Sequence, residues 1–187
     1  IQQLTDFQDS VTGIILPTTI NGGGGSNGKR QKTSNNNFST STYECIASSV
    51  DGYVRTYDLR MGQLRSDHFQ SPVTGISLSK DKNCIAASLL NGKIGLLERS
   101  SGELLNEYCG GHKAGTYSLG LALMSDATTM ASCSEDGCFY LYDLVTRDYK
   151  QVGGVGVKGA LISLSAHVDE QILLTANSRD KFALCYK

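Results

Sequence analysis

Four side chains in the second half of the chain have the types that nucleophilic catalysis uses, namely His112, Ser132, Asp136 and Tyr142. A serine can attack a carbonyl carbon when a histidine takes its proton and an acid orients the histidine. The reaction also needs a sharp turn that exposes the nucleophile and N–H groups that stabilise the oxyanion. The sequence around Ser132 has neither signature, so we expect these four residues to have a structural role.

A glycine-rich stretch could bind phosphate, because Gly23, Gly28 and Lys29 fit the spacing G-x-x-x-x-G-K. A working phosphate loop continues with Ser or Thr for the metal and opens a helix. Arg30 takes that place and the following "QKTSNNNFS" favours no helix. We therefore expect a flexible insertion over residues 18–42, rich in Gly, Asn and Ser, and leave a nucleotide-binding protein as a remote alternative. The basic cluster "KRQK" within it is either a solvated loop or a weak nuclear-import or nucleic-acid signal.

The composition excludes several classes of function. The 187 residues are 40% hydrophobic and 19% charged, with a net charge of −1 and no long apolar run, which indicates a soluble globular protein without a membrane span. A balanced charge argues against direct nucleic-acid binding. The six cysteines show no C-x-x-C pair and no histidine at ligand spacing, so we expect reduced thiols, several of them in the core, with no metal and no cofactor. They are Cys45, Cys84, Cys109, Cys133, Cys138 and Cys185.

A repeated turn organises the chain. Asp51-Gly52, Asn91-Gly92 and Asp136-Gly137 each separate two short alternating apolar runs, and Asp180 stands at the corresponding place in a fourth unit. The steps between these turns are 40, 45 and 44 residues, which is the spacing of propeller blades. Asp-Gly and Asn-Gly favour type I′ hairpins.

Each unit predicts a four-stranded antiparallel meander, with strands a to d from the inside outward, so the fold class is all-β. We expect blades at about 9–66, 71–108, 116–153 and 159–187. The last unit stops after its third strand, and the first begins at its inner strand. We therefore expect residues 1–187 to be four blades of a larger ring, most simply seven, in which a strand from the N-terminus completes the last blade.

The repeats resemble the WD-repeat β-propellers. Gly111-His112 is similar to the Gly-His of that family, and Tyr57-Asp58 and Tyr142-Asp143 stand where its Trp-Asp falls. The other units have Leu97-Glu98 and Cys185-Tyr186 at that position. The resemblance implies a hydrogen-bonded tetrad of His112, Ser132, Asp136 and Tyr142, in which Ser134 could replace Ser132. We also expect Asp58 and Asp143 to accept hydrogen bonds in the c–d turns.

The resemblance implies a non-enzymatic scaffold. The strings "YDLRMGQL" and "GELLNEY…GHK" are similar to a member that organises the extracellular-signal-regulated, mitogen-activated kinase cascade. The alternative is a spliceosome-associated subunit in pre-mRNA splicing. The implied partners are kinase-cascade proteins or splicing factors, in the cytoplasm and nucleus, with no small-molecule substrate. Partners would dock on the face that carries the d–a and b–c loops, where Lys113 and Glu135 lie.

Overall fold

The computed structural model describes residues 3–17, 43–153, 159–167, 169–179 and 183–186. The predicted insertion at 18–42 and the turn residue Asp180 lie outside these residues. The described residues form fifteen strands, and among them no helix is long and apolar enough to cross a membrane. The strands are β1 (Val11–Ile15), β2 (Glu44–Ser49), β3 (Tyr53–Asp58), β4 (Gln63–His68), β5 (Val73–Leu78), β6 (Cys84–Leu89), β7 (Lys93–Glu98), β8 (Leu104–Cys109), β9 (Leu121–Leu123), β10 (Thr129–Cys133), β11 (Phe139–Asp143), β12 (Tyr149–Val152), β13 (Leu161–Ala166), β14 (Leu173–Asn177) and β15 (Ala183–Tyr186).

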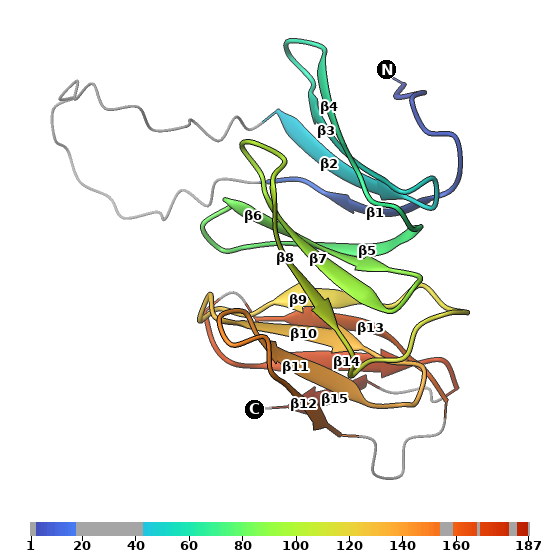
Figure 1. Cartoon of the computed structure of the whole chain (residues 1–187), viewed down its shortest axis with the longest axis vertical. Helices are drawn as coiled ribbons and strands as arrows, with labels where there is room; N and C mark the ends of the chain where they lie inside the picture. The colour runs from blue at the N-terminus through green and yellow to red at the C-terminus, as the bar shows by residue number, and fades with distance from the viewer. Residues whose placement is uncertain (1–2, 18–42, 154–158, 168, 180–182, 187) are drawn as a thin grey trace, which may run out of the picture.

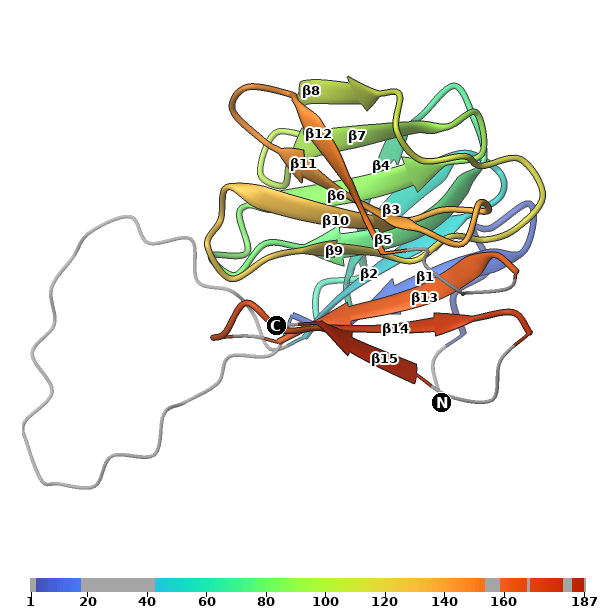
Figure 2. The ribbon, with the colours of Figure 1, turned by 90° about the horizontal axis from the view of Figure 1, so that it is seen from below.

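These strands pair in chain order into four antiparallel sheets. Three sheets have four strands, with the orders β1–β4, β5–β8 and β9–β12, and the described part of the last sheet is β13-β14-β15. Figure 1 shows the sheets stacked along the long axis of the molecule, and Figure 2 shows β14 between β13 and β15 at its lower end. The predicted all-β fold of repeated antiparallel sheets is confirmed.

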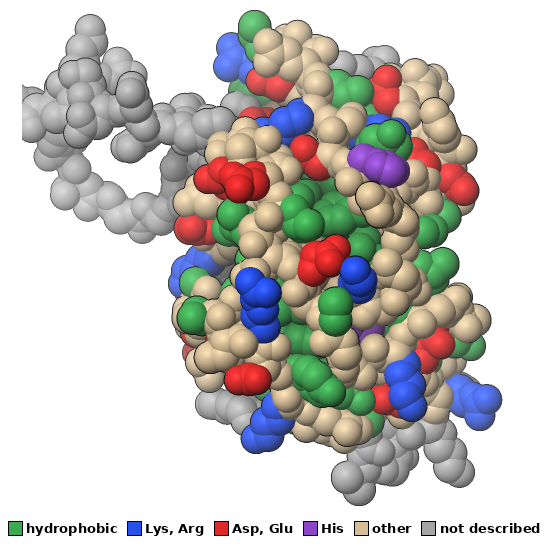
Figure 3. Space-filling model, viewed as in Figure 1, with side chains coloured by type: hydrophobic (Ala, Val, Ile, Leu, Met, Phe, Trp, Pro, Cys, Tyr) green, Lys and Arg blue, Asp and Glu red, His purple; other side chains and the backbone are tan. Residues whose placement is uncertain are grey.

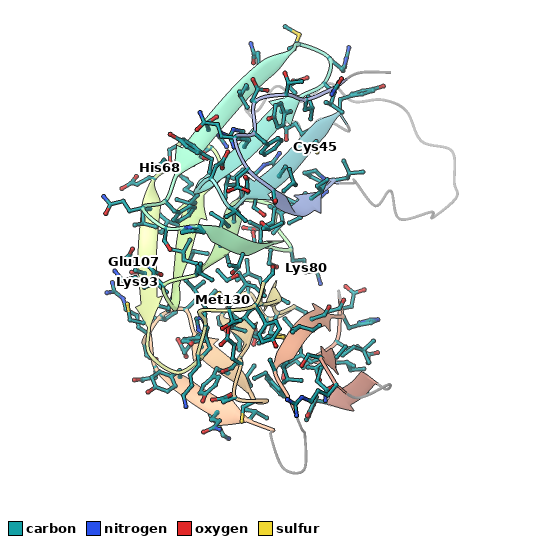
Figure 4. The ribbon with its side chains drawn as sticks, turned by 90° about the vertical axis from the view of Figure 1, so that its right-hand side faces the viewer. Cys45, His68, Lys80, Lys93, Glu107 and Met130 are labelled. Atoms are coloured by element: carbon teal, nitrogen blue, oxygen red, sulfur yellow. The ribbon has the colours of Figure 1, made fainter. Side chains whose placement is uncertain are left out.

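The sheets follow one another in an arc, as Figure 4 shows. The inner strands β1, β5, β9 and β13 contact each other in that order, so each sheet meets the next through its first strand. In Figure 4, Met130 lies between two sheets, whereas Lys80 lies on the concave side and the ion pair of Lys93 with Glu107 lies on the outer edge. The arc therefore has an inner surface of first strands and an outer rim of fourth strands.

The hairpin turns differ from the predicted type I′ geometry. Three residues separate β2 from β3, and the Gly52 amide donates to the carbonyl of Ser49 at 3.2 Å. The Gly92 amide donates to the carbonyl of Leu89 at 3.0 Å in the same way. In these two turns only the glycines have positive φ, +87° at Gly52 and +79° at Gly92. The type I′ prediction is therefore wrong, because a third loop residue lets the aspartate or asparagine keep a negative φ.

Glycines in the inner strands allow neighbouring sheets to approach closely. A Cβ atom added at Gly75 of β5 would lie 2.7 Å from the carbonyl oxygen of Leu119. One added at Gly120 would lie 2.8 Å from the backbone nitrogen of Leu164. Real Cβ contacts are longer, so any side chain at these positions would force the inner strands apart.

Hydroxyl groups also join neighbouring sheets close to these glycines. Thr12 Oγ1 donates to the carbonyl of Val73 at 2.9 Å, from the first sheet to the second. Ser88 Oγ donates to the carbonyl of Leu119 at 3.1 Å, from the second sheet toward the third. Ser88 is buried, so its bond satisfies a polar group that would otherwise destabilise the fold, and the Thr12 bond is partly buried.

Apolar side chains fill the space between successive sheets in three clusters. Ile46 and Ile85 lie between the first and second sheets, and Phe139 and Leu161 lie between the third and fourth. Cys45, Cys133 and Cys138 are buried, as expected of core thiols, and all six cysteines are free. Cys185 is exposed, which corrects its placement in the core, because β15 has no further strand beside it among the described residues.

Candidate protein-binding face

One end of the arc carries the turns between second and third strands and the connections that lead into the next sheet. We call this end the loop face, and it comprises residues 3–10, 50–52, 69–72, 90–92, 110–118 and 134–138. The sequence-predicted site residues of the b–c turns lie here, whereas the Tyr-Asp positions lie at the far ends of the third strands. A different set of side chains supports the loop face in each sheet.

In the third sheet, His112 and Tyr142 form a buried pair. The Tyr142 hydroxyl donates to the carbonyl of Gly110 at 2.7 Å and accepts from the His112 amide at 3.1 Å. His112 Nδ1 lies 2.8 Å from the same hydroxyl. Because the single hydroxyl proton goes to Gly110, Nδ1 must carry the ring proton and donate. Tyr142 thus holds the Gly110–His112 connection against β11.

His112 is buried, with 5% of its surface exposed. Its Nε2 has no hydrogen-bond partner among the described residues. Burial lowers the pKa of His112, and the charge of Asp136 acts in the opposite direction. The imidazole is therefore neutral at pH 7.

The other two members of the predicted tetrad lie elsewhere. Asp136 is exposed rather than buried, and its carboxylate accepts from the Tyr140 hydroxyl at 2.8 Å and from the Cys138 amide at 3.0 Å. Ser132 is fully buried and its hydroxyl donates to the carbonyl of Cys133. Ser134 instead meets the loop face, where its Oγ accepts from the Lys113 amide at 2.9 Å. Among the described residues, His112 and Tyr142 are the only two of the four that bond each other, while Asp136 bonds Tyr140 and Ser132 bonds Cys133.

Tyr140 explains this division. It stands four residues after Asp136 on β11, where its hydroxyl reaches the carboxylate that the resemblance assigns to the tetrad. Partial burial opposes ionisation of Asp136, but hydrogen bonds from Ser134, Tyr140 and the Cys138 amide hold its pKa below the ordinary value. Asp136 is therefore an ionised turn anchor.

The first sheet supports its turn with an ion pair. Arg55 Nη1 donates to both carboxylate oxygens of Asp51, at 3.1 and 2.8 Å, and both side chains are almost fully buried. The guanidinium carbon lies 4.8 Å from the ring centre of Phe7 and 4.6 Å from that of Tyr53. The amide of Gln8 also donates to Asp51 at 3.0 Å. Desolvation opposes ionisation, but these donors keep the pKa of Asp51 low, so the pair stays charged.

The second sheet uses an aromatic side chain. Gly95 occupies the place of Arg55 and Tyr140, four residues after the turn residue Asn91. A Cβ atom at Gly95 would overlap the ring of Phe69, which fills the space that a side chain would occupy. Asn91 Oδ1 accepts only a local bond here, from the Lys93 amide at 3.1 Å. The turn between the second and third strands is therefore supported by an ion pair in the first sheet, by a phenylalanine ring in the second and by a tyrosine in the third.

Phe7 and Phe69 are functional supports that the sequence patterns did not identify. The available signal is Gly95, since a glycine inside a strand often marks the close approach of another group.

At the opposite end of the arc, the Tyr-Asp positions shape the turns between third and fourth strands. Asp58 Oδ1 accepts from the amides of Arg60 and Met61, at 2.9 and 3.0 Å. Asp143 Oδ1 accepts from the amides of Val145 and Thr146, at 2.8 and 2.9 Å. These are the turn hydrogen bonds that we expected of the two aspartates.

The residues before these acids pack between sheets. Tyr57, Leu97 and Tyr142 are buried, while Tyr186 stacks edge-on against Phe139 with ring centres 4.7 Å apart. Glu98 accepts from Ser101 Oγ within its own turn. The Trp position of the family is therefore a packing position in the first three sheets, while in the last sheet Cys185 is exposed and the neighbouring Tyr186 packs instead.

The exposed part of the loop face is held in shape by Glu135. Its Oε1 accepts from the amides of Thr116 and Tyr117, at 2.5 and 2.9 Å, and its own amide donates to the carbonyl of Lys113 at 3.0 Å. Burial opposes ionisation, but the backbone donors together hold the pKa of Glu135 below its ordinary value. Tyr117 is 45% exposed and Lys113 is exposed on this fixed connection. An ordered and exposed tyrosine suits protein recognition.

The face has little to support catalysis. Ser132 is buried and bonded within its strand, and His112 is bonded to Tyr142, so these two candidates are not placed to react with a substrate. Among the described residues, no group of three or more His, Cys, Asp or Glu could hold a metal ion. On the side shown in Figure 3, the described acidic and basic side chains are interspersed, without the continuous basic patch that nucleic-acid binding uses.

Comparisons with known proteins agree with this architecture. Residues 102–143 match the family model "WD domain, G-beta repeat". The chain is 43% identical over 136 residues to the rat WD repeat domain-containing protein 83 and 44% identical to the human protein. Each alignment covers 73% of this chain and 42% of the relative, so the chain spans less than half the length of these relatives.

Solved structures show the same fold at low sequence identity. A structure of U3-55K matches with a TM-score of 0.75 and 16% identity, over 98% of this chain and 50% of that one. The WD40 repeats of RRP9 match with a TM-score of 0.71, also at 16% identity, over 96% of this chain and 48% of that one. With its four antiparallel sheets, its matched repeat and these relatives, the chain belongs to the WD-repeat family of β-propeller proteins.

Proposed function

We propose that this chain is a non-enzymatic scaffold that binds other proteins through the loop face. The observation that carries the proposal is the fixed connection at 113–118, where Glu135 holds two backbone amides and leaves Tyr117 exposed. Tyrosine is enriched at the centres of protein interfaces because it offers a large contact area and loses little entropy on binding. The rigid sheets below the connection keep the entropy that is lost on binding small.

The proposed partners are components of the extracellular-signal-regulated kinase cascade. This choice rests on the similarity of the strings "YDLRMGQL" and "GELLNEY" to the mitogen-activated protein kinase organiser, together with relatives named WD repeat domain-containing protein 83. A role in pre-mRNA splicing rests on the same resemblance, and the test must distinguish it from a role in the kinase cascade. Both roles place the protein in the cytoplasm and nucleus.

Affinity capture from cell extract, followed by mass spectrometry, tests the partner class. The expected result is enrichment of kinase-cascade proteins with the unmodified chain and their loss with Tyr117→Ala. Val145→Ala is the matched control, because Val145 is exposed on a turn at the opposite end of the arc. Enrichment of small nuclear ribonucleoproteins instead would support the splicing role. Equal capture by the unmodified chain, Tyr117→Ala and Val145→Ala would contradict the proposal that partners bind the loop face.

A further inference from the structure

At the end of the arc opposite the loop face, aspartates hold the connections between first and second strands in two of the sheets. In the second sheet, Asp81 Oδ1 accepts from the amide of Asn83 at 3.1 Å. In the third sheet, Asp126 Oδ1 accepts from the amides of Thr128 and Thr129, at 3.1 and 2.9 Å. In both connections a carboxylate holds amides that follow it by two or three residues.

The fourth sheet uses a histidine in the same role. His167 follows β13, and its Nδ1 accepts from the amides of Asp169 and Glu170, at 3.2 and 3.1 Å. A ring nitrogen that accepts a hydrogen bond carries no proton, so the proton of the neutral ring lies on Nε2. When the imidazole takes up a second proton, Nδ1 becomes a donor and can no longer hold the two amides. An ionised aspartate has no such limit.

The three connections therefore respond differently to pH. The Ser79 hydroxyl lowers the pKa of Asp81. Burial opposes ionisation of Asp126, but hydrogen bonds from Thr129 and its neighbour hold the pKa of this carboxyl below its ordinary value. His167 is exposed, and histidine is the side chain type that ordinarily changes charge between pH 5 and 8. Of these three described connections, only the one in the fourth sheet is held by a group of that type.

This connection also links the fourth sheet to two others. Lys80 Nζ donates to Asp169 Oδ1 at 2.9 Å, from the second sheet to the fourth. Gln171 Nε2 lies 3.5 Å from Asp126 Oδ2 in the third sheet. Lys80 and His167 both line a cavity of about 270 Å³ between β5, β9 and β13, on the concave side where Figure 4 shows Lys80. The connection thus bridges three sheets where their inner strands meet.

The charges around His167 favour an exchange of partners when the ring is protonated. They come from Asp169 and Glu170 on the same connection, from Lys80 on the second sheet and from Asp126 on the third. The hydrogen bond and charge of Lys80 lower the pKa of Asp169, and a charge on His167 acts in the same direction. A protonated His167 therefore loses the two amides, attracts the carboxylate of Asp169 and competes with Lys80 for it.

We propose that His167 is a pH-sensitive latch, whose protonation releases the amides of Asp169 and Glu170 and weakens the bridge from Lys80 to the fourth sheet. The two side chains of that bridge are 50% and 72% exposed, so the ion pair contributes little to global stability. The consequence is a local opening at the concave side rather than unfolding of the chain. The latch lies at the opposite end of the arc from the loop face and goes beyond the proposed scaffold function.

Nitrogen–proton correlation spectra of the full chain, recorded from pH 8 to pH 5, test the latch. At pH 8 the ring signals of His167 should show the proton on Nε2. As the ring takes up a proton, the amide signals of Asp169 and Glu170 should shift with the same midpoint. Their protection from hydrogen exchange, corrected for the intrinsic effect of pH, should fall roughly threefold to tenfold. The amides of Thr128 and Thr129, which a carboxylate holds, are the internal control and should keep their protection.

Two variants separate the parts of the proposal. His167→Asn is the matched variant, because an asparagine oxygen can accept from the same two amides and does not titrate. It should keep the protection of Asp169 and Glu170 from pH 8 to pH 5. In Lys80→Ala the carboxylate of Asp169 is free to attract the protonated ring, so the midpoint of the His167 titration should move to higher pH.

Three results would overturn the proposal: a proton on Nδ1 of His167 at pH 8, an equal pH response of the two amides in His167→Asn, or an unchanged midpoint in Lys80→Ala. Because these measurements use the chain without a binding partner, their outcomes are separate from success or failure of the scaffold proposal.

Discussion

Replacing Gly75 by alanine tests how the sheets pack. Gly75 has no positive φ, so alanine can adopt its backbone conformation and the cost is steric. The new methyl group would lie 2.7 Å from the carbonyl oxygen of Leu119 and 3.1 Å from Ser88 Oγ, and both partners belong to the inter-sheet bond at 3.1 Å. Overpacking costs about 1–3 kcal/mol. The lost hydrogen bond adds about 1 kcal/mol.

We therefore expect Gly75→Ala to lower the free energy of unfolding by about 2–4 kcal/mol, the sum of these two effects. Urea denaturation measures it as a lower midpoint with an unchanged slope. Gly115→Ala is the matched control, since a Cβ atom there would meet nothing within 4 Å, and its stability should stay within about 0.5 kcal/mol or rise slightly. Equal stability of the two variants would refute the close packing of β5 against the third sheet.

Three further changes have defined outcomes. Tyr142→Phe should lower the free energy of unfolding by about 1–3 kcal/mol in urea, because Gly110 and His112 lose their shared hydroxyl, and an unchanged midpoint would show that this network contributes nothing. Arg147 has φ +66°, so Arg147→Gly should raise stability by about 0.5–1 kcal/mol, and a loss of stability would contradict the strain. Burial lowers the pKa of His112, so below a pH of about 6.5 the imidazole is protonated in the unfolded chain before it is protonated in the folded one. The free energy of unfolding should therefore fall from pH 7 to pH 5, and by more than it does in His112→Gln. Equal pH dependence in urea titrations would show that His112 is not the group responsible.

The repeated turns predicted the sheets because their signal is local. Asp51-Gly52 and Asn91-Gly92 recur between short alternating runs, and the chain reverses at each of them. The turn geometry was not predictable from the dipeptide alone. One more loop residue changes which positions need positive φ, and neither Asp51 nor Asn91 has it.

The support of the loop face depends on contacts between residues far apart in the sequence. The family pattern implies a hydrogen bond between His112 and Asp136. In the structure the Tyr140 hydroxyl bonds Asp136 instead, and His112 bonds Tyr142. In the first sheet, Asp51 and Arg55 carry opposite charges four residues apart, yet both side chains are almost fully buried and the Arg55 guanidinium lies over the ring of Phe7. Such choices depend on which side chain fills a shared space, and one sequence without its fold does not show that space.

The central claim is that partners bind the loop face. The most direct test measures, by titration calorimetry, the binding of a purified kinase-cascade partner to the unmodified chain and to Tyr117→Ala. Our account predicts that Tyr117→Ala weakens binding at least tenfold, which corresponds to about 1.4 kcal/mol, while Val145→Ala binds as the unmodified chain does. Binding that is unchanged in Tyr117→Ala but lost in Val145→Ala would place the partner at the opposite end of the arc and contradict the account.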